Sequence, residues 1–301
     1  MKTLIRAMCV LLSIVCFVKA ETRLASKQLD FDWPANSAQV PKLEIGAVEK
    51  LLNSLLMEAD PPVTVESFRF AALDSGPPFL IAVVDGSGRG FFNYVNAVRC
   101  NSSSQRCSFY LLASDMPHNL SSEVVDVDHD GLDEIVLQSV VYWDGIRTLP
   151  VYVFSIMKLV KAEFEDVSKT NAEYYTNHLL NRDPEGRKAA FVKELESGTD
   201  LSDEETGQKE LFEAQDRFRR YFYERNLLGK PDAGLSDAIS WSASTDIAYA
   251  DLAIRTLTGM QSKLALALLK KLATNNYVEI RSAASEALQS QGTIKRHMIV
   301  K

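Results

Sequence analysis

The sequence predicts an α+β protein, with a short antiparallel β domain followed by an α-helical domain. Between residues 63 and 170, short β-rich runs alternate with clusters of turn residues, a pattern typical of antiparallel sheets. After Asn171, apolar residues instead recur at helical spacing. The chain has 301 residues, which is enough for two such domains.

The first twenty residues, 1–20, have the order of a secretory signal peptide. Lys2 and Arg6 precede an apolar run from Met8 to Val18, and small residues stand three places and one place before Glu21. This run is shorter than the about 20 residues that cross a bilayer, and no later stretch is long and apolar enough. We therefore expect a secreted or periplasmic protein with no transmembrane segment after cleavage. A buried N-terminal helix is the alternative.

Cleavage would leave an acidic chain. Removing residues 1–20 takes away three basic residues and no acid, so the formal charge changes from −7 to −10. An acidic surface repels phosphate groups, which excludes nucleic acid as the expected partner. We expect a protein partner instead.

Cys100 and Cys107 are the cysteines that remain after cleavage. They flank a polar stretch between two strand-like runs, so in an oxidising compartment they predict a disulfide that closes a hairpin loop. Such a bridge places the two Cα atoms about 4.4–6.8 Å apart. A redox pair is the alternative, although the CxxC spacing typical of one is absent.

Residues 21–62 are expected to form a polar tether over 21–40 and then one amphipathic helix. Pro41 suits a first helical turn, and Pro61 and Pro62 end the helix. Its predicted core residues are Val48, Leu51, Leu52, Leu55 and Leu56. The strands are predicted at 79–84, 91–98, 108–113, 135–142 and 150–159. No helix follows the glycine-rich stretch 85–90, so it predicts a hairpin turn and not a phosphate-binding loop.

An acidic segment ahead of one predicted strand contains the candidate ligands. Asp126, Asp128 and Asp130 alternate, so a tight loop can direct three carboxylates to one point. Gly131 permits the sharp turn, and the carbonyl group of Leu132 can add a further oxygen. Calcium takes six to eight oxygen ligands, so this set fits Ca²⁺. An acidic surface turn without metal is the alternative.

The spacing differs from that of an EF-hand, because the twelfth position counted from Asp126 is Leu137 and not an acid. The segment resembles the calcium loop of FG-GAP and VCBS repeats, the blade units of β-propellers. The resemblance implies side-chain ligands at the first, third, fifth and ninth positions, and the ninth is Glu134. It leaves Asp133 and His129 facing solvent. One such loop implies a blade-like β domain rather than a closed propeller of about four to eight blades.

The helical domain, residues 171–301, is predicted to contain a long first helix. Ser202 and Glu205 match a capping box at its start. Its apolar face consists of Leu211, Phe212, Phe218 and Phe222, and its arginines are Arg217, Arg219, Arg220 and Arg225. The arginines predict a solvated face or, alternatively, a site for an acidic partner. Residues 230–234 are expected to be a linker, followed by helices at 248–257, 263–273 and 278–288.

Residues 246–290 resemble HEAT repeats. The first helix face is predicted from Leu264, Leu268, Leu269 and Leu272, and the second helix has Ile280, Arg281, Ala284, Ala287 and Leu288 in the family's places. The resemblance implies a binding surface with no chemistry of its own. It also implies that Leu268, Leu272, Ile280, Ala284 and Leu288 are buried between two antiparallel helices. An ordinary helical hairpin is the alternative.

The sequence contains no HExxH or GxSxG motif, and its four histidines are scattered. We therefore expect an exported, non-enzymatic binding or scaffold protein with a calcium-stabilised β module. The alternatives are a secreted or periplasmic hydrolase with structural calcium and dispersed catalytic residues, and a structural envelope protein whose acidic loop binds nothing.

Overall fold

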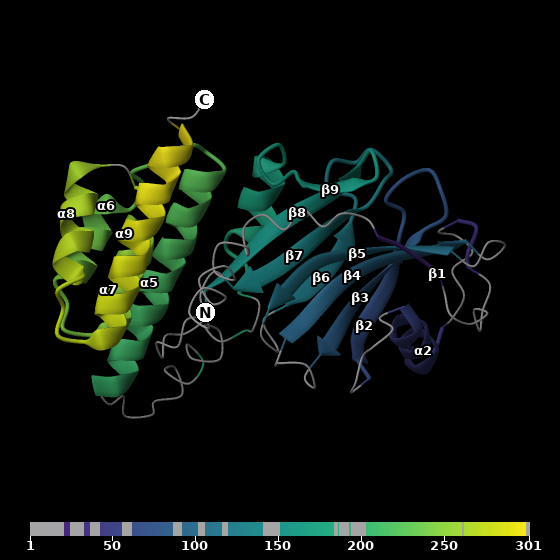
Figure 1. Cartoon of the computed structure of the whole chain (residues 1–301), viewed down its shortest axis with the longest axis horizontal. Helices are drawn as coiled ribbons and strands as arrows, with labels where there is room; N and C mark the ends of the chain where they lie inside the picture. The colour runs from purple at the N-terminus through teal and green to yellow at the C-terminus, as the bar shows by residue number, and fades with distance from the viewer. Residues whose placement is uncertain are drawn as a thin grey trace. The chain divides into compact units, whose positions relative to one another are not determined.

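The computed structural model describes residues 21–24, 33–36, 43–55, 62–86, 92–101, 106–115, 120–140, 151–183, 186, 193, 203–260 and 262–298. The chain divides into two compact units, one formed by residues 1–140 and 153–171 and the other by residues 141–152 and 172–301. The strands β1 to β9 precede the helices α5 to α9 along the chain, which confirms the predicted α+β class (Figure 1). The predicted signal peptide and the capping box at Ser202 lie outside the described residues.

The first unit contains a five-stranded sheet with the order β1-β5-β4-β3-β2, in which every pairing is antiparallel. Its strands are β1 (Glu21–Leu24), β2 (Thr64–Ala71), β3 (Phe79–Gly86), β4 (Phe92–Asn101) and β5 (Arg106–Asp115). The pairing of β3 with β4 confirms the hairpin that was predicted across residues 85–90. Strand β1 corrects the predicted tether, because its backbone pairs with β5.

A four-stranded sheet with the order β6-β7-β8-β9 completes the strands of the molecule's described part. These strands are β6 (Ser121–Val125), β7 (Glu134–Val140), β8 (Tyr152–Val160) and β9 (Glu163–Asp166). The hairpins β6–β7 and β8–β9 are antiparallel. Strands β7 and β8 lie where the sequence predicted them, whereas β6 and β9 were not predicted individually.

Strand β3 is buried on both faces because its side chains alternate between two hydrophobic clusters. Leu80, Ala82 and Val84 pack in the cluster that contains the buried side chains of helix α2 (Ile45–Leu55). Phe79, Ile81 and Val83 pack in the cluster that contains Ile135 and Leu137 of β7. The first unit therefore has three layers, with α2 on one face of the five-stranded sheet and the four-stranded sheet on the other.

Helix α2 confirms the predicted amphipathic helix, although it begins at Ile45 and not at Pro41. Val48, Leu51, Leu52 and Leu55 are buried, as expected from their spacing. Leu56 lies outside the described residues.

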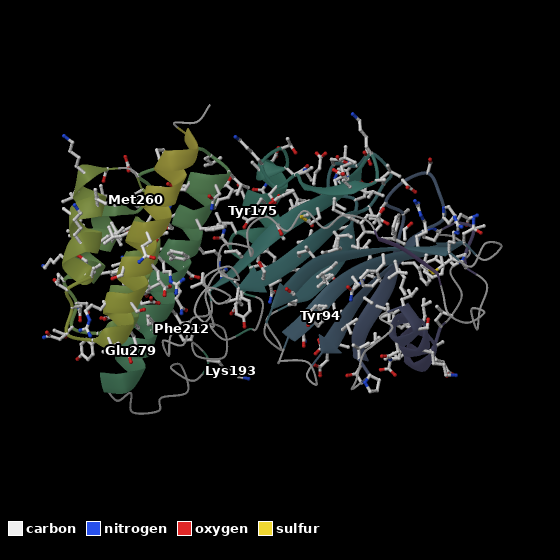
Figure 2. The ribbon with its side chains drawn as sticks, in the orientation of Figure 1. Tyr94, Tyr175, Lys193, Phe212, Met260 and Glu279 are labelled. Atoms are coloured by element: carbon white, nitrogen blue, oxygen red, sulfur yellow. A yellow bond between two sulfur atoms is a disulfide. The ribbon has the colours of Figure 1, made fainter. Side chains whose placement is uncertain are left out.

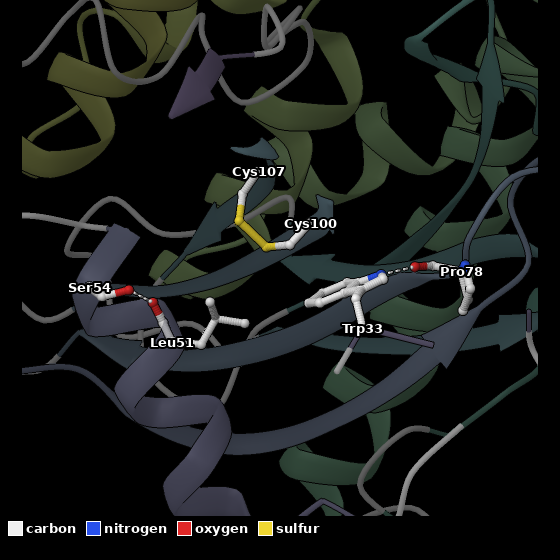
Figure 3. The surroundings of a disulfide bond; sticks show 6 residues. All are labelled: Trp33, Leu51, Ser54, Pro78, Cys100 and Cys107. Atoms are coloured by element: carbon white, nitrogen blue, oxygen red, sulfur yellow. Dashed lines mark hydrogen bonds between the residues drawn. A yellow bond between two sulfur atoms is a disulfide. The ribbon is translucent and has the colours of Figure 1, made fainter. Parts of the chain in front are cut away.

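The predicted disulfide is present between Cys100 on β4 and Cys107 on β5. The two residues are direct register partners, so their Cα atoms are 4.0 Å apart, closer than expected. Figure 3 shows the bridge together with Leu51 of α2 and Trp33 from the segment before α2, and all of these side chains belong to one buried cluster. Trp33 Nε1 donates a hydrogen bond to Pro78 O at 2.9 Å. The bridge therefore lies in the core between α2 and the sheet.

The second unit is helical. Its elements are α3 (Ala172–Tyr174), the π-helical turn η3 (Tyr175–Leu179), α5 (Asp203–Asn226), α6 (Leu235–Ser242), α7 (Ile247–Leu257), α8 (Lys263–Leu272) and α9 (Val278–Met298). Helix α6 was not predicted. It follows directly on the turn at residues 230–234, where Gly234 has a φ of +84° and lies too close to Tyr221 for a side chain to fit.

Helices α6 and α7 form one contacting pair, and α8 and α9 form the next. Between the two pairs, α6 contacts α8 and α7 contacts α9. Met260, labelled in Figure 2, is buried in the shared core with the fully buried Ile280 and Ala284. Leu272 is buried as expected, whereas Leu264, on the predicted apolar face of the same helix, is 49% exposed. Leu268 and Leu288 are partly buried.

The arginine cluster of α5 is not a uniform solvated face. Arg219 Nη1 donates to Arg182 O at 2.6 Å, and Arg225 Nη1 donates to Thr256 O at 2.6 Å. Arg217 and Arg220 are exposed. Arg219 and Arg225 therefore bind backbone carbonyls that lie outside α5 but within the same unit. Among the described residues, no helix is both long enough and apolar enough to cross a membrane.

Candidate metal centre

The acidic loop joins β6 to β7 as the connection of an antiparallel hairpin. The strand pairing ends at Val125 and Glu134, so Glu134 is the first residue of β7. The loop therefore leads directly into a strand, as its resemblance to the repeat loops implied. Gly131 has a φ of +85°, which glycine adopts without strain, and the exposed His129 has a φ of +59°. These two left-handed residues turn the chain sharply between the strands.

Three aspartates converge inside this turn. Asp126, Asp128 and Asp130 each present a carboxylate oxygen, and these oxygens all lie within 4.8 Å of one another. Asp126 accepts hydrogen bonds from the N–H groups of Asp130 and Gly131, at 3.1 and 3.0 Å. A carboxylate has about four lone-pair positions, so these bonds leave Asp126 able to bind a cation as well. The predicted convergence of the three aspartates is confirmed.

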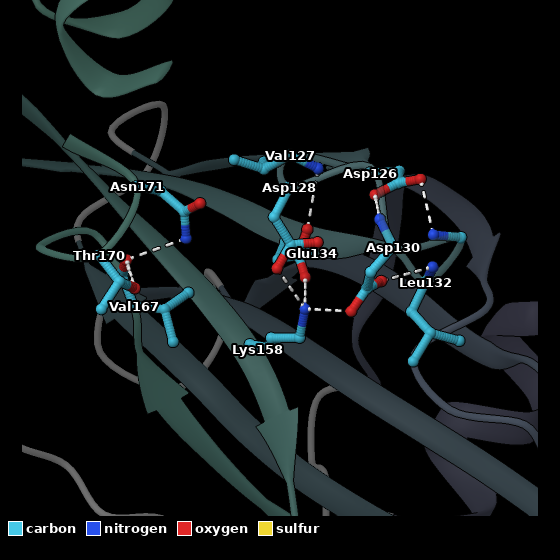
Figure 4. A network of polar contacts seen from close by, with 11 residues as sticks. Asp126, Val127, Asp128, Asp130, Leu132, Glu134, Lys158, Val167, Thr170 and Asn171 are labelled. Carbon is cyan, nitrogen blue, oxygen red and sulfur yellow. Dashed lines mark hydrogen bonds and ion pairs between the residues drawn. The ribbon is translucent and has the colours of Figure 1, made fainter. Parts of the chain in front are cut away.

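A lysine from β8 points into this cluster (Figure 4). Lys158 Nζ lies 2.6 Å from Asp128 Oδ2, 2.8 Å from Asp130 Oδ2 and 2.7 Å from Glu134 Oε1. Glu134 is not part of the close group of three aspartates, but it meets Asp128 and Asp130 around this ammonium group. The structure thus brings together all four predicted side-chain ligands, together with one basic residue that was not predicted.

Glu134 is fully buried, and the sheet explains how it reaches the cluster. Ile135 and Leu137 pack in the core between the sheets, so the alternation of side chains directs Glu134 to the opposite face of β7. Met157 and Leu159 likewise direct Lys158 to the opposite face of β8. Glu134 Oε2 also accepts the N–H group of Val127 at 2.8 Å, which ties the start of the loop to the strand.

The electrostatics of the cluster keep Lys158 charged. Burial lowers the pKa of Lys158, but its hydrogen bonds with Asp128, Asp130 and Glu134 outweigh this effect and raise the pKa above its ordinary value. The hydrogen bond from Lys158, followed by that from the Leu132 N–H group, lowers the pKa of Asp130. Both shifts favour the charged forms of Lys158 and Asp130, so this ion pair stays charged at neutral pH.

Asp133 does not face solvent, which corrects the expectation from the repeat resemblance. Its Oδ2 accepts the N–H group of Ala72 at 2.6 Å, and its own N–H donates to Ala72 O at 2.8 Å. Ala72 directly follows β2, so Asp133 links the loop to the five-stranded sheet. Asp133 is a structural residue of the hairpin.

Two further residues complete the comparison with the sequence. The Leu132 N–H group donates to Asp130 Oδ1 at 2.9 Å, and the role predicted for the Leu132 carbonyl stays a prediction. Lys158 was missed because it lies 28 residues beyond Asp130 in sequence. Only the pairing of β7 beside β8 brings Lys158 to the loop, and no local pattern encodes that pairing.

Comparison of the chain with models of known protein families, with curated proteins and with solved structures found no match.

Proposed function

We propose that this chain is an exported, non-enzymatic binding or scaffold protein whose β unit binds calcium in the loop between β6 and β7. Side-chain oxygens of Asp126, Asp128, Asp130 and Glu134 would hold the ion, with the carbonyl of Leu132 as a further ligand. The bound ion would neutralise the repelling carboxylates and fix the hairpin. In this proposal the role of the calcium ion is structural.

The observation that carries the proposal is the convergence of hard oxygen donors. Calcium binds oxygen at about 2.3–2.6 Å, so ligands on opposite sides of one ion lie about 5 Å apart. The three aspartate oxygens all lie within 4.8 Å of one another, which fits that spacing. Neighbouring carboxylates repel one another, so a divalent ion bound between them would relieve that repulsion.

The resemblance to FG-GAP and VCBS repeats gives further support. A propeller blade is a four-stranded sheet. The sheet that carries the loop also has four strands, in sequence order, and the loop lies in its first hairpin. The chain would use one such blade-like sheet as part of a layered domain and not as part of a closed ring.

The helical unit supports the binding or scaffold role. Helix pairs that stack first helix on first helix and second on second are the arrangement of α-solenoid repeats, which present extended surfaces to partners. The pairs α6–α7 and α8–α9 have these contacts. The disulfide and the N-terminal sequence pattern support export to an oxidising compartment.

Thermal unfolding of the chain from Glu21 onward tests the calcium proposal. A ligand that binds only the folded state, at about 100 times its Kd, stabilises it by about 2.7 kcal/mol, so calcium should raise the Tm by several degrees over chelator. Asp130→Ala removes a ligand and should abolish most of this rise. Glu163→Ala removes an exposed acid at the start of β9 and is the matched control, so it should retain the rise. Equal losses in both variants would indicate a diffuse effect of surface charge and overturn the proposal.

A further inference from the structure

We propose that Lys158 sets the cation affinity of the loop, because its ammonium group occupies the place where a metal ion would meet the carboxylates. A metal ion would then bind only when the Lys158 side chain moves out. This inference rests on the proposed calcium function, since it concerns the same loop.

Lys158 contacts three of the four proposed side-chain ligands. An ammonium group has three N–H donors. Lys158 has three carboxylate neighbours, from Asp128, Asp130 and Glu134, at 2.6, 2.8 and 2.7 Å. These distances are close to those between calcium and its oxygen ligands, about 2.3–2.6 Å. The ammonium group and a calcium ion therefore cannot share the loop.

The buried carboxylate of Glu134 requires a positive charge beside it, whether or not a metal ion is bound. Its side chain has no exposed surface, and an ionised carboxylate is costly to bury without an opposite charge. Lys158 supplies this charge from β8 when no metal is bound. Removal of Lys158 alone would leave Glu134, Asp128 and Asp130 facing one another without that charge.

The charges of the network favour exchange over permanent closure. The formal charges of the four proposed side-chain ligands and Lys158 sum to −3. A divalent ion neutralises more of it than the single charge of Lys158 does. The Lys158 side chain is also 20% exposed, so it has a route to solvent. Lys158 therefore acts as an internal competitor that calcium displaces.

The substitution Lys158→Met tests this directly, since Met has a similar length and no charge. In chelator, the variant should unfold at a Tm about 4 °C or more below the parent. Calcium should restore the lost stability, and its Kd should be at least about tenfold lower than for the parent. Lys169→Met, at an exposed lysine in the turn after β9, is the matched control and should behave as the parent.

The outcomes separate this inference from the calcium proposal. Equal calcium affinity in the parent and Lys158→Met would overturn the role of Lys158 and leave the calcium proposal standing. Binding in Lys158→Met alone would support the role of Lys158 and reject calcium as a ligand of the parent. No calcium response in either protein would overturn both.

Chemical labelling of the parent covers the case in which Lys158→Met does not fold. Acetic anhydride should modify Lys158 slowly in chelator, and saturating calcium should raise that rate several-fold by releasing the side chain. The rate at Lys169 should not change. If calcium stabilises the parent while the labelling of Lys158 stays constant, the displacement is wrong. If calcium neither changes the labelling nor restores folding of Lys158→Met, the inference is overturned as well.

Discussion

Both oxygens of Glu134 have partners, although its side chain is fully buried. The Val127 N–H group binds Oε2, and the Lys158 ammonium group lies 2.7 Å from Oε1. A buried carboxylate needs such partners. Glu134, the first residue of β7, therefore links the start of the loop to the middle of β8. Glu134 was predicted as a metal ligand, and it also connects two strands of the four-stranded sheet through its ion pair with Lys158.

Asp133→Ala should destabilise the protein equally with and without calcium. The carboxylate of Asp133 accepts a hydrogen bond from Ala72, and the loss of that acceptor should cost about 1–3 kcal/mol. Asp133→Asn retains an oxygen acceptor and should cost less. Urea unfolding in chelator and in calcium measures both variants. A loss that occurs only in calcium would make Asp133 a ligand and contradict the structural role given to it.

The aspartate spacing alone predicted which acids converge, because alternate residues of a tight turn face the same point. It could not predict Lys158 or the bond from Asp133 to Ala72. Both depend on which strands lie side by side and in which register, and distant residues determine that. For single residues, the sequence therefore predicted which acids converge but not which distant residues bind them.

At the scale of single elements, the β4–β5 hairpin depends on its disulfide. Replacing Cys100 and Cys107 together with alanine should lower the free energy of unfolding by about 2–3 kcal/mol, since the bridge restricts the unfolded chain. Chemical denaturation measures the loss. Thiol labelling of the unfolded, unreduced parent from Glu21 onward should find no free thiol. Two reactive thiols, or no change in stability, would contradict the role of the bridge.

The seam between α8 and α9 is closely packed at Ala284. This residue is fully buried with Leu269 and Ile280, so Ala284→Leu should overpack the core and cost about 1–3 kcal/mol. Ser282→Leu changes an exposed position of the same helix and should stay within about 0.5 kcal/mol of the parent. Equal costs at the two positions would contradict this packing.

Helical periodicity predicted α5, α7, α8 and α9 because each has a repeating apolar stripe. It could not tell which residues of the apolar face of α8 are buried: Ala265, Leu269 and Leu272 are buried, whereas Leu264 is exposed. It missed α6, which has only 8 residues and two buried side chains. Short elements contain too few turns to show a period.

For the whole molecule, the change from strand-like to helical periodicity near Asn171 was enough to predict the class. The layering of the first unit was not predictable, because it depends on β3 being buried on both faces. A strand buried on both faces is uniformly apolar, and its sequence does not tell which neighbour covers which face. The pairing of β1 with β5 could not be predicted either, because it joins segments that are far apart in the sequence.

We propose above that the β6–β7 loop is a calcium site in which Lys158 competes with the ion. Calorimetric titration of calcium into the chain from Glu21 onward tests it most directly. We expect one saturable site, with a Kd of about 10⁻⁴–10⁻³ M, in the range of extracellular calcium modules. The heat should be absent in Asp130→Ala. A parent protein that gives no saturable heat, or the same isotherm for Asp130→Ala, would contradict a calcium site in this loop.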